Sequence, residues 1–152
     1  MKDSIMKHKR VLGVGEEVDF LSILEEKILG ACPECRFDKA TTFEMGVQYL
    51  ASYTYDVVVL DIMAARGSDL LDQAQAHNFP AVVLMDNGAS PEVLEGFMAT
   101  GARAFLTKER PHEIVPTIEQ VIKIESMPRW KRVLRKLRGD FQPWFPPNGY
   151  GY

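Results

Sequence analysis

The sequence has few of the residues that build disulfide frameworks and metal centres: two cysteines and three histidines in 152 residues. Cys32 and Cys35 form a Cys-Pro-Glu-Cys segment, but no second pair of cysteines or histidines stands near them to complete a four-ligand zinc site. A redox Cys-x-x-Cys motif opens a helix, whereas this one precedes residues 36–40, which read as a strand. We interpret both cysteines as reduced bystanders in a loop.

The sequence also lacks a long apolar run. No apolar stretch approaches the about 20 residues that cross a bilayer. Residues 1–10 are charged, but the apolar run after them covers only 11–14 and is followed at once by Glu16 and Glu17, which is not the pattern of a secretion signal. We therefore expect a cytoplasmic protein without a membrane span. Its 46% hydrophobic and 26% charged residues are ordinary for one soluble domain.

Short apolar runs alternate with longer amphipathic segments along most of the chain. The expected strands cover residues 11–14, 36–40, 56–60, 81–85 and 104–107, and the expected helices cover 19–29, 43–50, 68–76, 91–100 and 111–124. The run 57–60 is apolar throughout, as a parallel strand covered on both faces requires. The alternation predicts an α/β fold, a doubly wound five-stranded parallel sheet with helices on both faces.

Several helix ends carry recognisable signals. Thr42 and Ser90 are predicted N-caps, and Gly101 is a predicted C-terminal stop. Pro116 follows Pro111 by five residues, so the last helix either begins late or is kinked there.

Charged residues follow the strands at one edge of the predicted sheet. Glu16 and Glu17 follow the first strand, Asp61 the third, Asp86 the fourth and Lys108 the fifth. The functional crevice of such a sheet lies beyond the carboxyl ends of its strands. Carboxylates gathered there repel one another, and Mg²⁺ relieves that repulsion. The pattern predicts an acidic magnesium pocket beside a carboxylate nucleophile, which is the apparatus for forming an aspartyl phosphate.

These features resemble the response-regulator receiver family over residues 8–126. The resemblance rests on the acidic turn after Val14, on the run from Val58 to Met63 and on the Phe-Leu-Thr-Lys segment 105–108. It implies a flavodoxin-like strand order 2-1-3-4-5 and a role in two-component phosphorelay signalling.

The resemblance also assigns roles to individual residues. It implies that Asp61 is the phosphoacceptor and that Lys108 is the cation that binds the phosphoryl group. It implies that Glu16 is a ligand of Mg²⁺ together with Asp61 and the backbone carbonyl of Met63, with Glu17 as a further candidate.

The chain departs from the family pattern at several of these positions. Gly15 stands where the family has the first of two acids, and Met85 stands where it has the hydroxyl that contacts the phosphoryl group. Glu109 replaces a proline, and residues 64–69 lack the usual proline and glycine of the loop after the phosphoacceptor. Phe105 matches the aromatic switch position; Met85 and Phe105 are thus the two switch candidates.

Three functions stay open at this point. The first, which we favour, is a non-enzymatic single-domain receiver that takes phosphate from a histidine kinase or phosphotransfer protein and signals to an unknown target by protein contact. The second is a pseudo-receiver, a phosphorylation-independent interaction module, which Gly15 and Met85 favour. The third is a small enzyme or flavin carrier; it lacks a Gly-rich phosphate loop after the first strand.

Residues 127–152 differ in character from the receiver domain at 8–126. Net charge is −8 over residues 1–128 and +5 over residues 129–152. Trp130, Val133, Leu134 and Leu137 recur at helical spacing with basic residues on the remaining surface, which predicts a basic amphipathic helix. An aromatic tail rich in proline and glycine follows. We expect this extension to dock on the acidic domain or to form a homodimer, and we expect no nucleic-acid binding because ten residues supply few phosphate contacts.

Overall fold

The computed structural model describes residues 4–62, 66–86, 90–128 and 130–131. Its strands are β1 (Arg10–Val14), β2 (Arg36–Ala40), β3 (Val57–Asp61), β4 (Ala81–Met85) and β5 (Ala104–Thr107). Its helices are α1 (Val18–Ala31), α2 (Phe43–Ser52), α3 (Gly67–Ala76), α4 (Pro91–Thr100), the 3-10 turn η1 (Pro111–Glu113) and α5 (Ile114–Glu125). The predicted bounds differ from these by at most three residues.

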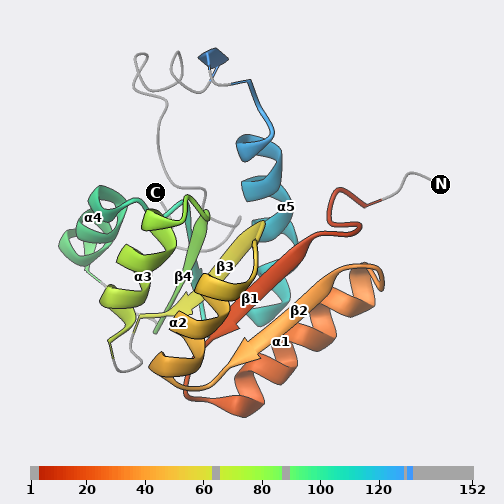
Figure 1. Ribbon diagram of the computed structural model, residues 1–152, viewed down its shortest axis with the longest axis horizontal. Coiled ribbons are helices and arrows are strands. Elements are labelled where there is room, and N and C mark those ends of the chain that lie inside the picture. The colour runs from red at the N-terminus through yellow and green to blue at the C-terminus, as the bar shows by residue number, and fades with distance from the viewer. Residues whose placement is uncertain (1–3, 63–65, 87–89, 129, 132–152) are drawn as a thin grey trace.

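The five strands form one parallel sheet in the order β2-β1-β3-β4-β5, with helices on both sides (Figure 1). This arrangement confirms the predicted doubly wound fold and its strand order. Because side chains alternate along a strand, Val57 and Val59 of β3 pack under α1 and α5, while Val58 and Leu60 pack under α2, α3 and α4. All five residues of β3 are buried, so the strand carries its last residue, Asp61, into the interior.

The predicted caps of α2 and α4 are confirmed. The Thr42 side chain accepts a hydrogen bond from the Met45 N–H, at 3.1 Å. The Ser90 side chain accepts one from the Val93 N–H, at 3.3 Å. Gly101 ends α4 with a φ of 107°, a conformation that glycine adopts without strain.

The last helix begins late, which decides between the two alternatives left open by its prolines. Residues Pro111–Glu113 form the separate turn η1, and α5 begins at Ile114. Pro116 therefore lies in the first turn of α5, where its missing N–H removes no helical hydrogen bond.

Both cysteines are free thiols, but they are buried in the core rather than lying in an open loop. Cys32 ends α1, where its N–H donates to the Ile28 carbonyl, and Cys35 lies just before β2. Burial is the main factor that raises the pKa of Cys35, to about 11. The Cys35 thiol therefore stays protonated at neutral pH and is a weak nucleophile and metal ligand, so we interpret Cys35 as a packing residue.

A group of charged and aromatic side chains connects the amino-terminal halves of β1, β2 and the approach to β3. The Asp38 carboxylate accepts hydrogen bonds from Tyr55 Oη at 2.8 Å, from Arg10 Nε at 3.1 Å and from Arg36 Nε at 3.2 Å. The Arg10 guanidinium also lies 3.9 Å from the centre of the Tyr53 ring. Burial raises the pKa of Asp38, but these hydrogen bonds outweigh it and hold the pKa below its ordinary value. We call these five residues the amino-edge cluster.

Most of the C-terminal extension lies outside the described residues. Trp130, which is 61% exposed, and Lys131 are described, whereas residue 129 and residues 132–152 are not, so the basic helix and its docking stay predictions.

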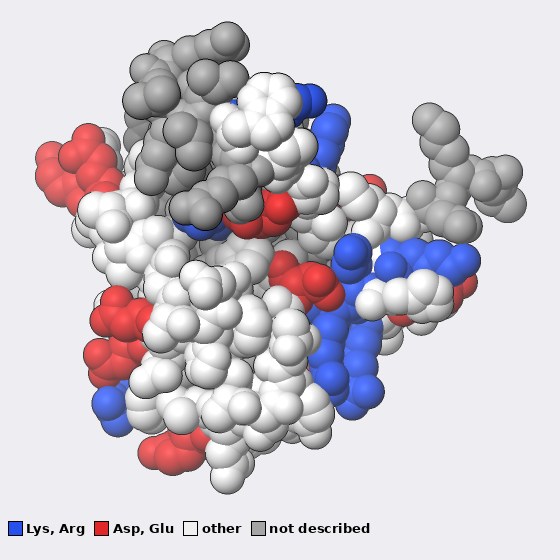
Figure 2. Space-filling view, turned by 45° about the horizontal axis from the view of Figure 1, so that its top comes forward, with Lys and Arg blue, Asp and Glu red and all other residues white. Residues whose placement is uncertain are grey.

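On the face shown in Figure 2, Asp and Glu side chains lie in several separate groups while Lys and Arg form one main group. None of the helices in the described part of the chain is long and apolar enough to cross a membrane, and the cytoplasmic location stays a prediction.

Candidate functional site

Asp61 and Lys108, predicted to meet at the carboxyl edge of the sheet, are in direct contact. Asp61 is the last residue of β3 and is 6% exposed. Lys108 follows β5, and its Nζ lies 2.6 Å from Asp61 Oδ2. The pair joins residues 47 positions apart in the sequence through β4, which lies between the two strands.

Backbone pairing places Lys108 at this edge. Met85 and Thr107, the last residues of β4 and β5, are partners in the sheet register. The Lys108 N–H donates to the Met85 carbonyl at 2.9 Å, which continues this pairing by one residue. The ammonium group therefore reaches Asp61 from a backbone that the sheet itself holds in place.

Two exposed acids complete the group around the ammonium. Glu17 Oε1 lies 3.2 Å from Lys108 Nζ, and Asp86 Oδ1 lies 4.0 Å from it. The side chains of Glu17 and Asp86 are 64% and 65% exposed, against 12% for Lys108. We call these four residues the Asp61 pocket: a buried ion pair with two exposed carboxylates at its rim.

The charges of the pocket set the protonation of its lysine. Burial lowers the pKa of Lys108, but the hydrogen bond and charge of Asp61, followed by those of Glu17, outweigh burial and raise the pKa above its ordinary value. Lys108 is therefore a cation throughout the neutral range, as a group that binds an anion must be.

Two glycines lie close to Asp61, Gly15 beside its side chain and Gly67 beside its backbone. A Cβ atom on Gly15 would lie 3.2 Å from Asp61 Cβ and 3.6 Å from its Oδ2, so a side chain at this position would extend toward the carboxylate. A Cβ atom on Gly67 would lie 2.8 Å from the Asp61 carbonyl oxygen and 2.9 Å from Ile62 Cα. No real Cβ approaches backbone this closely, so α3 can start here only with glycine.

Gly67 is a site residue that sequence reasoning missed. The comparison with the family pattern treated residues 64–69 as lacking the usual glycine of this loop. The structure shows that Gly67 supplies a close backbone contact with the residue proposed as phosphoacceptor. A glycine directly before a predicted helix, six residues after a strand-end aspartate, was the available signal.

The turn after β1 contains both acids that were predicted as metal ligands. Glu16, the expected metal ligand, is exposed in this turn. The ion pair from the turn to Lys108 is made by Glu17, which had been the additional candidate. Met63, whose carbonyl was expected to complete the metal site, lies outside the described residues.

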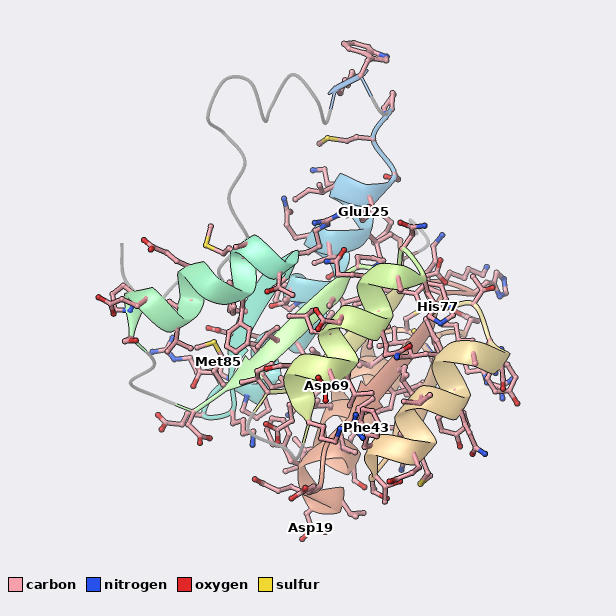
Figure 3. The ribbon with its side chains drawn as sticks, turned by 60° about the vertical axis from the view of Figure 1, so that its left-hand side comes forward. Asp19, Phe43, Asp69, His77, Met85 and Glu125 are labelled. Carbon is pink, nitrogen blue, oxygen red and sulfur yellow. The ribbon has the colours of Figure 1, made fainter. Side chains whose placement is uncertain are left out.

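The two switch candidates are both part of the core. Met85 is 2% exposed and Phe105 is fully buried, and both pack between the sheet and the helices α2 to α4. The Met85 side chain lies beside α4 in Figure 3. Met85 offers no hydroxyl to a phosphoryl group, so its contribution to the pocket is the backbone carbonyl that holds Lys108.

The residues of the pocket can supply only some of the ligands that Mg²⁺ needs. Within the part of the chain that the structure describes, no three Asp, Glu, His or Cys side chains are grouped so that they could hold a metal ion by themselves. Mg²⁺ commonly uses one or two carboxylates and takes its remaining ligands from phosphate oxygens and water. Asp61 and an acid of the 16–17 turn are the residues that would hold it.

Comparison with known proteins supports the architecture. No family model and no curated protein is similar to this sequence. The receiver domain of the Francisella response regulator 1452 superposes with a TM-score of 0.69 at 20% identity, covering 78% of this chain and 99% of that one. The chain has the fold of response-regulator receiver domains.

Other solved structures with this receiver fold agree. A CheY-like response regulator receiver domain from Methanospirillum hungatei has a TM-score of 0.67 at 19% identity, covering 76% of this chain and 94% of that one. The signal receiver domain of a DNA-binding response regulator from Colwellia psychrerythraea has a TM-score of 0.67 at 14% identity, covering 78% and 99%. At these identities the likeness concerns the fold, and the chemistry must be argued from the Asp61 pocket itself.

Proposed function

We propose that this protein is a non-enzymatic receiver module of two-component signalling. In this proposal Asp61 accepts a phosphoryl group from a histidine kinase or phosphotransfer protein, and the domain passes its state to a target by protein contact. The observation that carries the proposal is the 2.6 Å pair between Asp61 Oδ2 and Lys108 Nζ at the carboxyl edge of a receiver fold.

The reaction is a phosphoryl transfer to a carboxylate. An oxygen of Asp61 attacks the phosphorus of a phosphohistidine, the P–N bond breaks, the imidazole leaves with the bonding electrons, and an aspartyl phosphate forms. Lys108 neutralises charge on the transferred group, as it neutralises the carboxylate in the resting structure. Mg²⁺, when bound, would supply further neutralisation of phosphate oxygens.

Acetyl phosphate tests the proposal without a cognate kinase. The protein would be incubated with acetyl phosphate and Mg²⁺, and its intact mass read against an Asp61→Asn variant. We expect a labile phosphoryl adduct on the wild-type protein and none on the variant. An adduct of equal yield on both proteins would place the reactive group elsewhere.

A second candidate function is a pseudo-receiver that binds partners without phosphate. Gly15 favours it because the position that faces Asp61 from the first loop carries no acid, and Met85 favours it because its buried side chain has no hydroxyl. Absence of an adduct on the wild-type protein at any Mg²⁺ concentration, with folding shown intact, would select this function over phosphate acceptance.

A further inference from the structure

We propose that Glu17 is an intramolecular competitor for Lys108: its carboxylate holds the ammonium in the resting protein and is displaced when an anion of the phosphate class enters the pocket. The contact joins the loop before α1 to the loop after β5, residues 91 positions apart. For a phosphoryl group on Asp61 the inference rests on the proposed function. For a free phosphate anion it stands by itself.

The hydrogen bond of the Glu17 side chain is to Lys108 and not to the helix that Glu17 precedes. Glu17 is the N-cap residue of α1, where a side-chain acceptor usually binds an N–H group of the first helical turn. The structure shows no such bond from Glu17, whose Oε1 instead accepts from Lys108 Nζ at 3.2 Å. The Glu17 side chain therefore contacts the pocket lysine and does not cap α1.

Among the three carboxylates around Lys108, Glu17 is the one suited to leave. Asp61 is 6% exposed and ends a buried strand, so its pairing is fixed by the fold. Asp86 is at 4.0 Å, the outer limit of an ion pair. Glu17 is both close to Lys108 Nζ and 64% exposed. The loss of an exposed ion pair of this kind changes an equilibrium constant for binding or folding by up to about fivefold.

Electrostatic repulsion explains why an anion that enters the pocket would displace Glu17 from Lys108. An incoming phosphate carries about two negative charges and would be repelled by a carboxylate that already occupies the same ammonium. The ammonium has three donors, so it can bind Asp61 and an anion together once Glu17 has moved into solvent. Removing the charge of Glu17 should therefore strengthen anion binding rather than weaken it, the opposite of what a metal ligand or an anion-binding residue would show.

The experiment follows the Lys108 side chain by NMR while inorganic phosphate is added to the full chain at neutral pH. We expect Glu17→Gln to bind phosphate about two- to fivefold more tightly than the wild-type protein. Glu26→Gln is the matched control, because Glu26 is an exposed acid of the same helix and undergoes the same change. Asp19→Asn, an exposed acid in the first turn of α1, measures the general effect of removing one negative charge at this end of the helix.

The outcomes separate the two proposals. Tighter phosphate binding by Glu17→Gln than by both control variants supports the competitor role, even if acetyl phosphate leaves no adduct on Asp61, a result that counts against phosphate acceptance alone. An affinity of Glu17→Gln equal to that of the wild type or of Asp19→Asn overturns the competitor role. So does a Lys108 signal that phosphate does not perturb in any of the four proteins.

Discussion

The amino-edge cluster and the Asp61 pocket each hold an aspartate close to a cation on the buried sheet, but they surround that aspartate differently. Asp38 receives three hydrogen bonds from the chain's own side chains, and the cation beside it is covered by the Tyr53 ring. Asp61 instead has Gly15 beside its side chain, and Lys108, the cation beside it, also contacts the exposed acids Glu17 and Asp86. We therefore expect the charge of Asp38 to contribute more to stability than the charge of Asp61, the proposed phosphoacceptor.

The largest effect that separates the two regions should come from Asp38→Asn. The amide cannot accept from two guanidinium groups and a phenol as a carboxylate does, and its NH₂ group would face donors. We expect a loss of about 2–3 kcal/mol in the free energy of unfolding, measured by urea denaturation at neutral pH. A loss below about 0.5 kcal/mol would show that the cluster adds little to stability.

The amino-edge cluster should also make the free energy of unfolding depend on pH in the acidic range. Because the pKa of Asp38 in the folded protein is below its ordinary value of 3.8, its contribution is present above that value and is lost as pH falls through the folded pKa. The stability difference between wild type and Asp38→Asn should therefore shrink below about pH 4. A difference that stays constant down to pH 2 would contradict the cause given for the shift.

An intermediate effect is expected from Gly67→Ala, which adds a side chain against the backbone of Asp61 and Ile62. The new Cβ would meet backbone atoms of Asp61 and Ile62, which cannot rotate away, so we expect a loss of about 2 kcal/mol and slower acetyl phosphate labelling. Gly30→Ala is the matched control, because a Cβ there meets nothing within 4 Å on α1. The control should be neutral or more stable by about 0.5–1 kcal/mol, and equal losses in both variants would contradict the packing argument.

The smallest effect on stability should come from Asp61→Asn, the counterpart of Asp38→Asn. Lys108 would keep the carboxylate of Glu17, and the removal of one acid reduces the repulsion among the three acids around it. We expect a change within about 1 kcal/mol in either direction by the same urea assay. A loss as large as that of Asp38→Asn would mean that the Asp61 pair serves the fold in the same way.

Uninterrupted apolar runs such as Val57–Leu60 predicted the buried parallel sheet, and the resemblance to the receiver family supplied its strand order. The sequence predicted the meeting of Asp61 with Lys108 because parallel strands bring their carboxyl ends to one edge. It did not predict the ion pair of Glu17 with Lys108, since neighbouring acids in a turn differ mainly in side-chain direction. The glycine at position 67 was itself a signal of a close backbone approach, but the distances of that approach follow from the fold.

The amino-edge cluster was missed for a related reason. Arg10, Asp38 and Tyr55 are far apart in the sequence and become neighbours only through the register of β1 with β2 and β3. Periodicity identifies which residues face a core, but a polar contact across strands needs the register as well.

The most direct test of the account is to locate the phosphoryl group rather than to detect it. After acetyl phosphate treatment, sodium borohydride reduces an aspartyl phosphate to homoserine, which peptide mass spectrometry can assign to one position. The account predicts homoserine at residue 61 in the wild-type protein and in Glu26→Gln. Homoserine at residue 86 or at another acid, with residue 61 unmodified, would contradict it.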